Sequence, residues 1–108
     1  MISIVIVNCN TSKLLCDCLK SAQKHCPEAE IIVVDNASRD DSVRMVLHDF
    51  KNVTLVQLPE NRGSAGATNL GLRQASGEFL VLLNSDTILE DDSLTRCANW
   101  MDENPRIG

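Results

Sequence analysis

The chain is short of proline, glycine and positive charge, and each shortage excludes a class of protein. Three prolines and five glycines in 108 residues are too few for a collagen-like or proline-rich fibre. Ten Lys and Arg stand against fifteen Asp and Glu, which gives a net charge of -5. A protein that neutralises nucleic-acid phosphates needs clustered basic residues instead. We therefore expect no nucleic acid among the partners.

Long hydrophobic runs are also missing. The longest uninterrupted apolar run has five residues, at positions 79–83, whereas a membrane-spanning helix needs about 20. The sequence does not open with a basic segment followed by an apolar one, which is the pattern of an export signal. Its five cysteines are an odd number, which is typical of reduced thiols. These observations predict a cytoplasmic protein.

What the chain does contain is typical of a single globular domain. A hydrophobic content of 44% excludes a disordered chain. Short β-branched runs alternate with segments whose apolar residues recur at helical spacing, and the second helix is expected to begin at the S-x-x-D pattern of residues 38–41. Strands are predicted at residues 2–7, 30–34, 53–58 and 79–83. This order predicts an α/β, Rossmann-like fold with a mainly parallel sheet of about four strands and helices on both faces.

Polar clusters follow each predicted strand, at residues 8–10, 35–38, 61–66 and 84–87. In parallel α/β sheets, ligands bind beyond the carboxyl ends of the strands. Asp35 can accept hydrogen bonds from a ligand's ring N–H or ribose hydroxyls, or it can cap the following helix. Arg62 and Gly63 open a helix whose free N–H groups suit phosphate, while Gly71 is better explained by tight helix–sheet packing. Asp86 is placed to hold a divalent cation that bridges to a diphosphate.

Four motifs in order then carry a resemblance to a known family. They are VDNASRDDS at residues 34–42, NRG at 61–63, NLG at 69–71 and LLNSDT at 82–87, and the opening segment 3–10 fits as well. With this spacing the chain resembles family 2 glycosyltransferases of the GT-A fold over essentially its whole length. The most similar members are bacterial, rhamnosyltransferase-like enzymes that decorate polysaccharides. The resemblance implies that residues 1–108 are the N-terminal, nucleotide-sugar-binding portion of such an enzyme.

The resemblance also implies a site. Asp86 would match the last Asp of the family's D-x-D metal motif and hold Mg or Mn, while Asn84 replaces the first Asp. The donor would be a UDP- or dTDP-sugar, and the full-length enzyme would also bind a saccharide acceptor. No residue of this chain matches the general base, so no catalytic residue is expected in it. The nucleotide-binding residues would be Val7, Asn8, Asn10, Asp35, Ser38, Asp40, Arg62, Gly63, Asn69, Asn84 and Ser85.

Two other functions are weaker alternatives. A sugar-nucleotide pyrophosphorylase would need a glycine-rich loop and a basic residue directly after the first strand, and residues 8–11 lack both. The other is a non-catalytic nucleotide-binding or receiver module. A phosphate-accepting receiver would need an acidic pair after the first strand and a Lys after a late strand, and both are absent. The full-length transferase would be cytoplasmic or lie at the inner face of the membrane. Apolar surface beside strand 79–83 and a partly exposed Trp100 predict a homo-oligomer.

Overall fold

Strands and helices alternate along the chain, as predicted. The computed structural model describes residues 1–103, except for the side chains of Met101 and Asp102. The elements are β1 (Ile2–Asn8), α1 (Ser12–His25), β2 (Glu30–Asp35), α2 (Ser42–Asp49), β3 (Thr54–Gln57), α3 (Gly63–Gln74), β4 (Phe79–Asn84) and α4 (Ser93–Glu103). Within the described residues, the four strands form one parallel sheet in the order β3-β2-β1-β4. The predicted α/β fold is confirmed.

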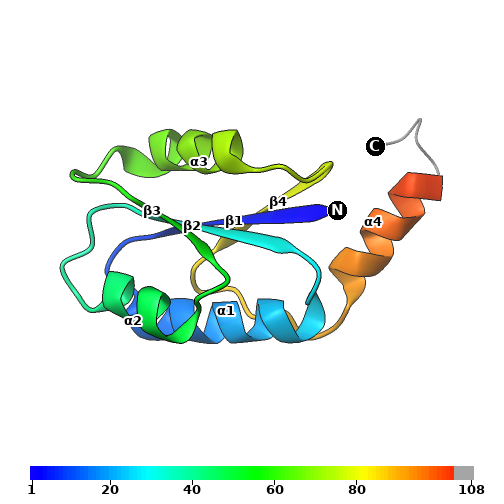
Figure 1. Cartoon of the computed structure of the whole chain (residues 1–108), viewed down its shortest axis with the longest axis horizontal. Coiled ribbons are helices and arrows are strands. Elements are labelled where there is room, and N and C mark those ends of the chain that lie inside the picture. Colours follow the sequence, from blue (N-terminus) through cyan, green and yellow to red (C-terminus); the bar gives the residue numbers. More distant parts are fainter. Residues whose placement is uncertain (104–108) are drawn as a thin grey trace.

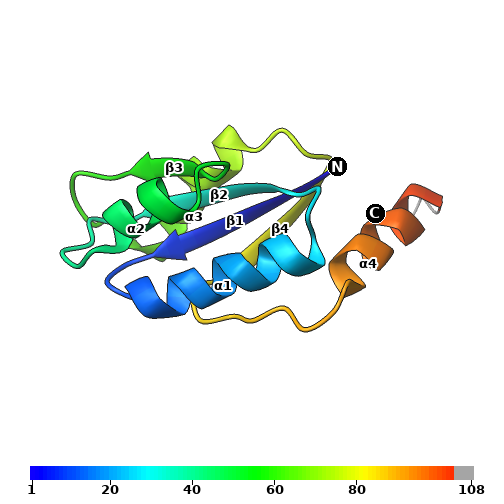
Figure 2. The same cartoon turned by 60° about the horizontal axis from the view of Figure 1, so that its bottom comes forward.

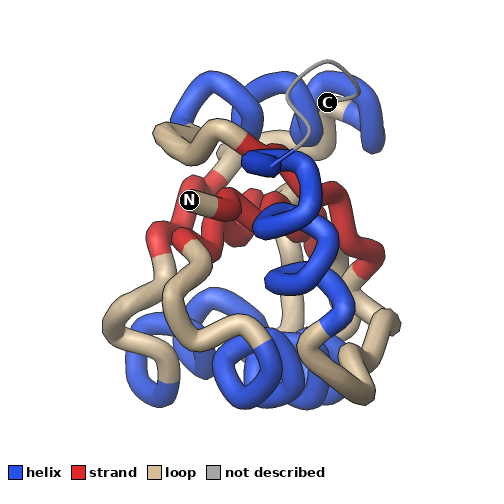
Figure 3. Tube along the Cα trace, turned by 90° about the vertical axis from the view of Figure 1, so that its right-hand side faces the viewer, coloured by secondary structure: helices blue, strands red, loops and turns tan. Residues whose placement is uncertain are grey.

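Helices cover both faces of this sheet (Figure 1). The strands β1 and β2 are buried on both sides because most of their residues are apolar and β-branched. Ile4 and Ile6 of β1 pack in the cluster under α1 and α2, whereas Val5 packs in the cluster under α3. Seen from the end, α3 forms one outer layer, and α1 and α2 form the other (Figure 3).

The helix α3 lies close against the sheet because its inner face is made of small residues. Ala67 and Gly71 are both buried, and a Cβ atom on Gly71 would collide with the methyl groups of Val5 and Val34. The interpretation of Gly71 as a packing residue is therefore confirmed. The main contacts of α3 are with β1 and β2, so this helix leaves part of the sheet uncovered.

The uncovered part is the edge strand β4. Leu80 and Leu82 are 50% and 56% exposed, and Trp100 of α4 is 49% exposed. The predicted apolar surface beside this strand is thus present, and the prediction of a partly exposed Trp100 is confirmed. In the turned view of Figure 2, α4 extends away from the sheet, beyond the end at which the chain begins. None of the helices within residues 1–103 has both the length and the apolar character needed to cross a membrane.

The start of α2 was predicted wrongly. The helix begins at Ser42 rather than at the S-x-x-D pattern, with Asp41 as its N-cap residue. Ser38 does not cap it, because the Ser38 hydroxyl accepts hydrogen bonds from the Asn10 backbone N–H at 2.9 Å and the Asn8 amide at 3.3 Å. The helix start is held instead by Asp40, whose carboxylate accepts from the Ser42 backbone N–H at 2.9 Å.

Candidate functional site

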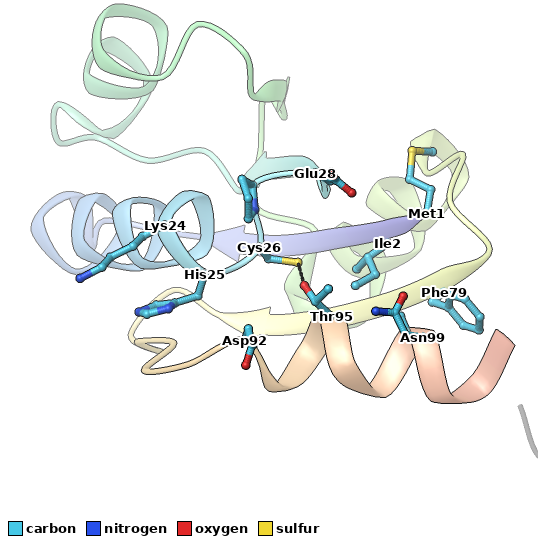
Figure 4. Close-up of a pocket in the computed structure, with 12 residues that line it drawn as sticks. Met1, Ile2, Lys24, His25, Cys26, Glu28, Phe79, Asp92, Thr95 and Asn99 are labelled. Carbon is cyan, nitrogen blue, oxygen red and sulfur yellow. Dashed lines mark hydrogen bonds between the residues drawn. The ribbon is translucent and has the colours of Figure 1, made fainter. Parts of the chain in front are cut away.

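Two cavities of similar size lie at opposite edges of the sheet. One, of about 690 Å³, is lined by residues from the beginnings of β1 and β4, the end of α1, and α4. Figure 4 shows Cys26 and Thr95 in contact in its wall, with a hydrogen bond of 3.5 Å between Sγ and Oγ1. None of the predicted site residues lines this cavity.

The other cavity, of about 670 Å³, lies at the carboxyl ends of β1, β2 and β3 and contains Asn10, Asp35 and Ser38 in its wall. Its volume is within the range of small-molecule sites. The sheet order puts β1 between β2 and β4, so the order of the strands reverses between β1 and β4, beside this cavity. Parallel α/β folds place ligands at such a switch point. The candidate site is therefore at the carboxyl edge.

Asp35 is the buried carboxyl group of this edge, at 3% exposure. Its Oδ1 accepts from Asn8 Nδ2 at 3.1 Å, and its Oδ2 accepts from the Ser38 backbone N–H at 2.9 Å. Each carboxylate oxygen can accept a further bond, so Asp35 keeps acceptor capacity toward the cavity. Asn8 is fully buried, and its amide is directed toward Asp35 and Thr11. Its predicted contact with a nucleotide stays a prediction.

Asn10 ties the ends of β1 and β2 together. Its Oδ1 accepts from the backbone N–H groups of Arg39 at 2.6 Å and Asp40 at 3.3 Å. Both Asn10 and Ala37 have a positive φ, of 56° and 59°. Left-handed backbone costs energy in a residue with a side chain, and such strain is often found at functional sites. The structure thus brings Asn10, Ser38 and Asp40 into one loop cluster beside Asp35.

Asp40 connects the starts of the two helices on the lower face in Figure 1. Its carboxylate accepts from the backbone N–H groups of Ser12 at 3.1 Å and Ser42 at 2.9 Å. Desolvation alone would raise the pKa of Asp40, but the hydrogen bonds from Ser42 and Ser12 outweigh it and hold the pKa below its usual value. Asp40 is therefore an anion at neutral pH.

The start of α3 is held to the end of β2 by Asn36, a residue to which the sequence analysis gave no role. Asn36 is 4% exposed, its Oδ1 accepts from the Arg62 backbone N–H at 2.9 Å, and its Nδ2 donates to the Gly63 carbonyl at 3.3 Å. Arg62 and Gly63 are therefore adjacent to Asp35 through one bridging residue, and Gly63 needs its positive φ of 72° to begin the helix there. The only feature of the sequence that points to Asn36 is its position directly after Asp35.

The turn after β4 presents Asp86. The Thr87 backbone N–H donates to the Asn84 carbonyl at 3.0 Å, which closes the turn and leaves the Asp86 side chain exposed. Beneath it, the Cys18 thiol contacts the same carbonyl at 3.8 Å. Burial raises the pKa of Cys18 to about 11, with a smaller contribution from the negative charge of Asp86. Cys18 is therefore a neutral packing residue under the turn.

The donor set at this turn fits a cation only in a limited way. Among the described residues, no three His, Cys, Asp or Glu side chains gather as a metal-binding cluster. Asp86 would be a single carboxylate ligand. That arrangement suits a magnesium-like ion that keeps waters and takes its other oxygen ligands from substrate phosphates, rather than a cation held in a protein cage.

Asn69 lies outside the loop cluster around Asp35. It is exposed on α3, six positions beyond Gly63, or about 9 Å along the axis at 1.5 Å per residue. No hydrogen bond within residues 1–103 connects it to the remaining predicted residues. Its role in nucleotide binding stays a prediction.

Comparison with known proteins decides which family has this arrangement. The model of the family described as Glycosyl transferase family 2 matches residues 3–108. The chain belongs to this family. Over 99% of its length, this family 2 chain is 34% identical to the poly-beta-1,6-N-acetyl-D-glucosamine synthase of Staphylococcus epidermidis, of which it covers 27%. It is 30% identical to an uncharacterized glycosyltransferase of Haemophilus influenzae, of which it covers 43%. The chain therefore spans less than half the length of these family 2 relatives.

Solved structures agree with this assignment. The chain superimposes on Staphylococcus aureus TarS 1-349 in complex with UDP-GlcNAc with a TM-score of 0.84 and 30% identity, covering 94% of this chain and 31% of that one. The mannosyltransferase PcManGT from Pyrobaculum calidifontis, in complex with GDP-Man and Mn²⁺, gives a TM-score of 0.77 and 27% identity, with 93% and 32% covered. The family 2 resemblance and the predicted GT-A architecture are thus confirmed.

Proposed function

We propose that this chain is the donor-binding portion of a glycosyltransferase that takes a sugar from a UDP- or dTDP-sugar. The observation that carries the proposal is the convergence of three predicted features at one edge of the sheet. Asp35 ends β2, Arg62 is held to that end by Asn36, and Asp86 follows β4. The complex of TarS with UDP-GlcNAc supports a uracil nucleotide.

Each feature meets a different part of the donor. The Asp35 carboxylate accepts from the ring N–H of a pyrimidine base, since it is buried in the wall of the cavity and retains free lone pairs. The Arg62 guanidinium and the N–H groups that open α3 bind the diphosphate. The remaining nucleotide-binding residues are proposed from the resemblance. They are Val7, Asn8, Asn10, Ser38, Asp40, Gly63, Asn69, Asn84 and Ser85.

We further propose that a divalent cation, Mg²⁺ or Mn²⁺, binds at Asp86. The chain carries a net charge of -5, so an approaching diphosphate is repelled unless its charge is neutralised. When bound, the cation supplies positive charge at the oxygens of the leaving nucleoside diphosphate. The Mn²⁺ in the PcManGT complex supports this assignment.

Transfer itself requires parts of a longer family 2 enzyme. We assign the saccharide acceptor site and the general base to such parts, because no residue of this chain matches the base. The donor-binding portion then holds the nucleotide while the acceptor hydroxyl attacks the anomeric carbon of the sugar and the nucleoside diphosphate leaves. We place this step in the cytoplasm or at the inner face of the membrane. The 108-residue chain should bind nucleotide without transferring sugar.

A thermal-unfolding titration with UDP tests the proposal. We expect the wild-type chain to be stabilised by UDP with Mn²⁺, and a ligand at about 100 times its dissociation constant adds roughly 2.7 kcal/mol. In Asp86→Asn, the additional stabilisation that Mn²⁺ gives to UDP binding should be lost, because the cation loses its carboxylate ligand. Asp17→Asn is the matched control, since Asp17 is an exposed carboxylate on α1, and it should behave as wild type.

Two results would contradict the proposal. A wild-type chain that is not stabilised by millimolar UDP or dTDP, with or without Mn²⁺, has no donor site. If Asp86→Asn keeps the full effect of Mn²⁺ while UDP still binds, the cation is bound elsewhere and the metal assignment is wrong.

The uncovered face of β4 supports a proposal about assembly. Leu80 and Leu82 are exposed by half or more and lie on an edge strand, and such edges promote association. We expect light scattering to show a dimer or larger species as the concentration of the chain rises. Leu82→Lys should return it to a monomer, because a lysine on an edge strand opposes pairing. Leu47→Lys places the same charge on α2, at a leucine that is 57% exposed, and should not. A wild-type chain that stays monomeric at all concentrations would contradict this proposal.

A further inference from the structure

The hydroxyl group of Thr11 is used in an unusual way. Thr11 is the N-cap residue of α1 but makes no side-chain capping bond, although threonine at this position commonly accepts from the first turn of the helix. Its Oγ1 lies 2.6 Å from Asn8 Oδ1 and 2.9 Å from Ser85 Oγ. The hydroxyl therefore connects the end of β1 to the turn after β4.

The direction of these hydrogen bonds follows from chemistry. The Asp35 carboxylate only accepts, so the amide nitrogen of Asn8 must face it and the amide oxygen must face Thr11. Thr11 has a single hydroxyl hydrogen, which it gives to that oxygen. In the bond between Thr11 and Ser85 the donor is therefore Ser85. The chain of bonds runs from Ser85 through Thr11 and Asn8 to Asp35, with every donor directed toward the carboxylate.

The two ends of this chain lie at different parts of the proposed site. Asp35 is in the wall of the cavity, and Ser85 directly precedes Asp86. Because the hydrogen of Ser85 is committed to Thr11, its oxygen has only lone pairs left to offer. A lone pair suits a cation and not a phosphate oxygen, which needs a donor. Successive hydrogen bonds in one direction also strengthen each other.

We propose that Thr11 is a positioning residue that holds Ser85 as an acceptor beside Asp86 and couples the cation end of the site to the nucleoside end. The inference rests on the proposed function, since it concerns the same nucleotide and cation. It changes the role of Ser85: its hydroxyl oxygen faces the cation, while the predicted contact was with the nucleotide. Thr11 itself touches neither ligand.

The test is the gain in UDP affinity that Mn²⁺ provides, measured as the dissociation constant in EDTA divided by that in Mn²⁺. Thr11→Val removes the hydroxyl and preserves the branched shape, so Ser85 is free to turn its hydrogen toward the cation. We expect the gain to fall about tenfold, the effect of one hydrogen bond that supports a charged group. Thr11→Ser restores the hydroxyl and should restore the gain. Thr54→Val is the matched control, because Thr54 is exposed on β3.

Ser85→Ala provides an independent variant if Thr11→Val does not fold. It should lower the gain by a similar factor, and the double variant should lose no more than either single one, because both changes break the same connection. A gain that is unchanged in Thr11→Val or in Ser85→Ala overturns the inference, as do losses that simply add.

Failure of the proposed function would look different. If wild type binds UDP and Mn²⁺ increases its affinity, but Thr11→Val and Ser85→Ala act independently, only the inference is wrong. If wild type binds no UDP, the proposed function fails. The double-mutant cycle of Thr11→Val and Ser85→Ala, measured by thermal unfolding without ligand, then reports only on the hydrogen bond between the two residues. If the two changes are coupled in that measurement, the bond contributes to folding stability alone and the inference is overturned as well.

Discussion

Replacing Gly71 with alanine should strongly destabilise this chain. The new Cβ would overlap the Val5 methyl and lie 2.9 Å from the Val34 methyl, and both valines are fully buried. Side chains in a packed core cannot yield without strain, which typically costs about 1–3 kcal/mol. We expect about 3 kcal/mol, or a fall in the melting temperature of roughly 12–20 °C for a domain of this size. Thermal and urea unfolding both measure it.

The same helix offers a control for this prediction. A Cβ on Gly66 has only the Cβ of Arg62 near it, at 3.3 Å, and Arg62 is exposed. Gly66→Ala should therefore be neutral or stabilise by up to about 1 kcal/mol through helix propensity. Combining Gly71→Ala with Val5→Ala should cost less than the sum of the two, because the second change makes room for the first. Equal effects at both glycines, or strict additivity, would show that α3 is not held by close contact at Gly71.

The strands could be predicted to within one or two residues because their signal is local. The run of β-branched residues in β1 and β2 is buried on both faces, as such runs require. Only β3 is shorter than expected, since it pairs with β2 over Thr54–Gln57 alone. The helix stripes were equally local, and α1 ends at His25 before Pro27, where the missing N–H of proline stops it.

The start of α2 was missed because a short pattern has no information about distant partners. Ser38 has the composition of a helix cap, but its hydroxyl is occupied by Asn8 and Asn10, which are 30 and 28 positions away. A hydroxyl that forms bonds between two strand ends cannot also cap a helix. Asp40 takes that task and links α1 to α2 as well.

In the candidate site too, residues marked by a local pattern could be predicted and residues defined by distant bonds could not. Asp35 and Asp86 could be found from the sequence, because a carboxylate directly after an apolar strand is placed at the edge of the sheet by topology alone. Asn36 and Thr11 could not, since their importance lies in bonds to Arg62, 26 positions away, and to Ser85, 74 positions away. Sequence spacing predicts which residues reach the edge of the sheet, but not which of them hold the others in place.

Asp35→Asn should weaken UDP binding by about tenfold to a hundredfold and should also lower either the folding stability or the effect of Mn²⁺ on that binding. The first loss follows because a bond from the base to a carboxylate is worth more than one to an amide. The second follows from the chain of hydrogen bonds that ends at Asp35. An amide in its place has one donor end, which must face either the Ser38 N–H or the Asn8 amide.

If the new amide nitrogen faces the Ser38 N–H, two donors point at each other, which costs about 1–3 kcal/mol of folding stability. If the new amide nitrogen faces Asn8 instead, that cost is avoided only when the Asn8 amide turns over. Thr11 then donates to Ser85, and the hydrogen of Ser85 would point to the cation. Asp35→Asn should therefore lose either stability or the Mn²⁺ effect, and calorimetric titration with parallel thermal unfolding separates the two outcomes. Asp17→Asn, with an exposed carboxylate, should change neither. An Asp35→Asn chain with wild-type stability and a wild-type response to Mn²⁺ would show that the bonds between Asp35 and Ser85 carry no coupling, and undiminished UDP affinity would remove Asp35 from the donor site.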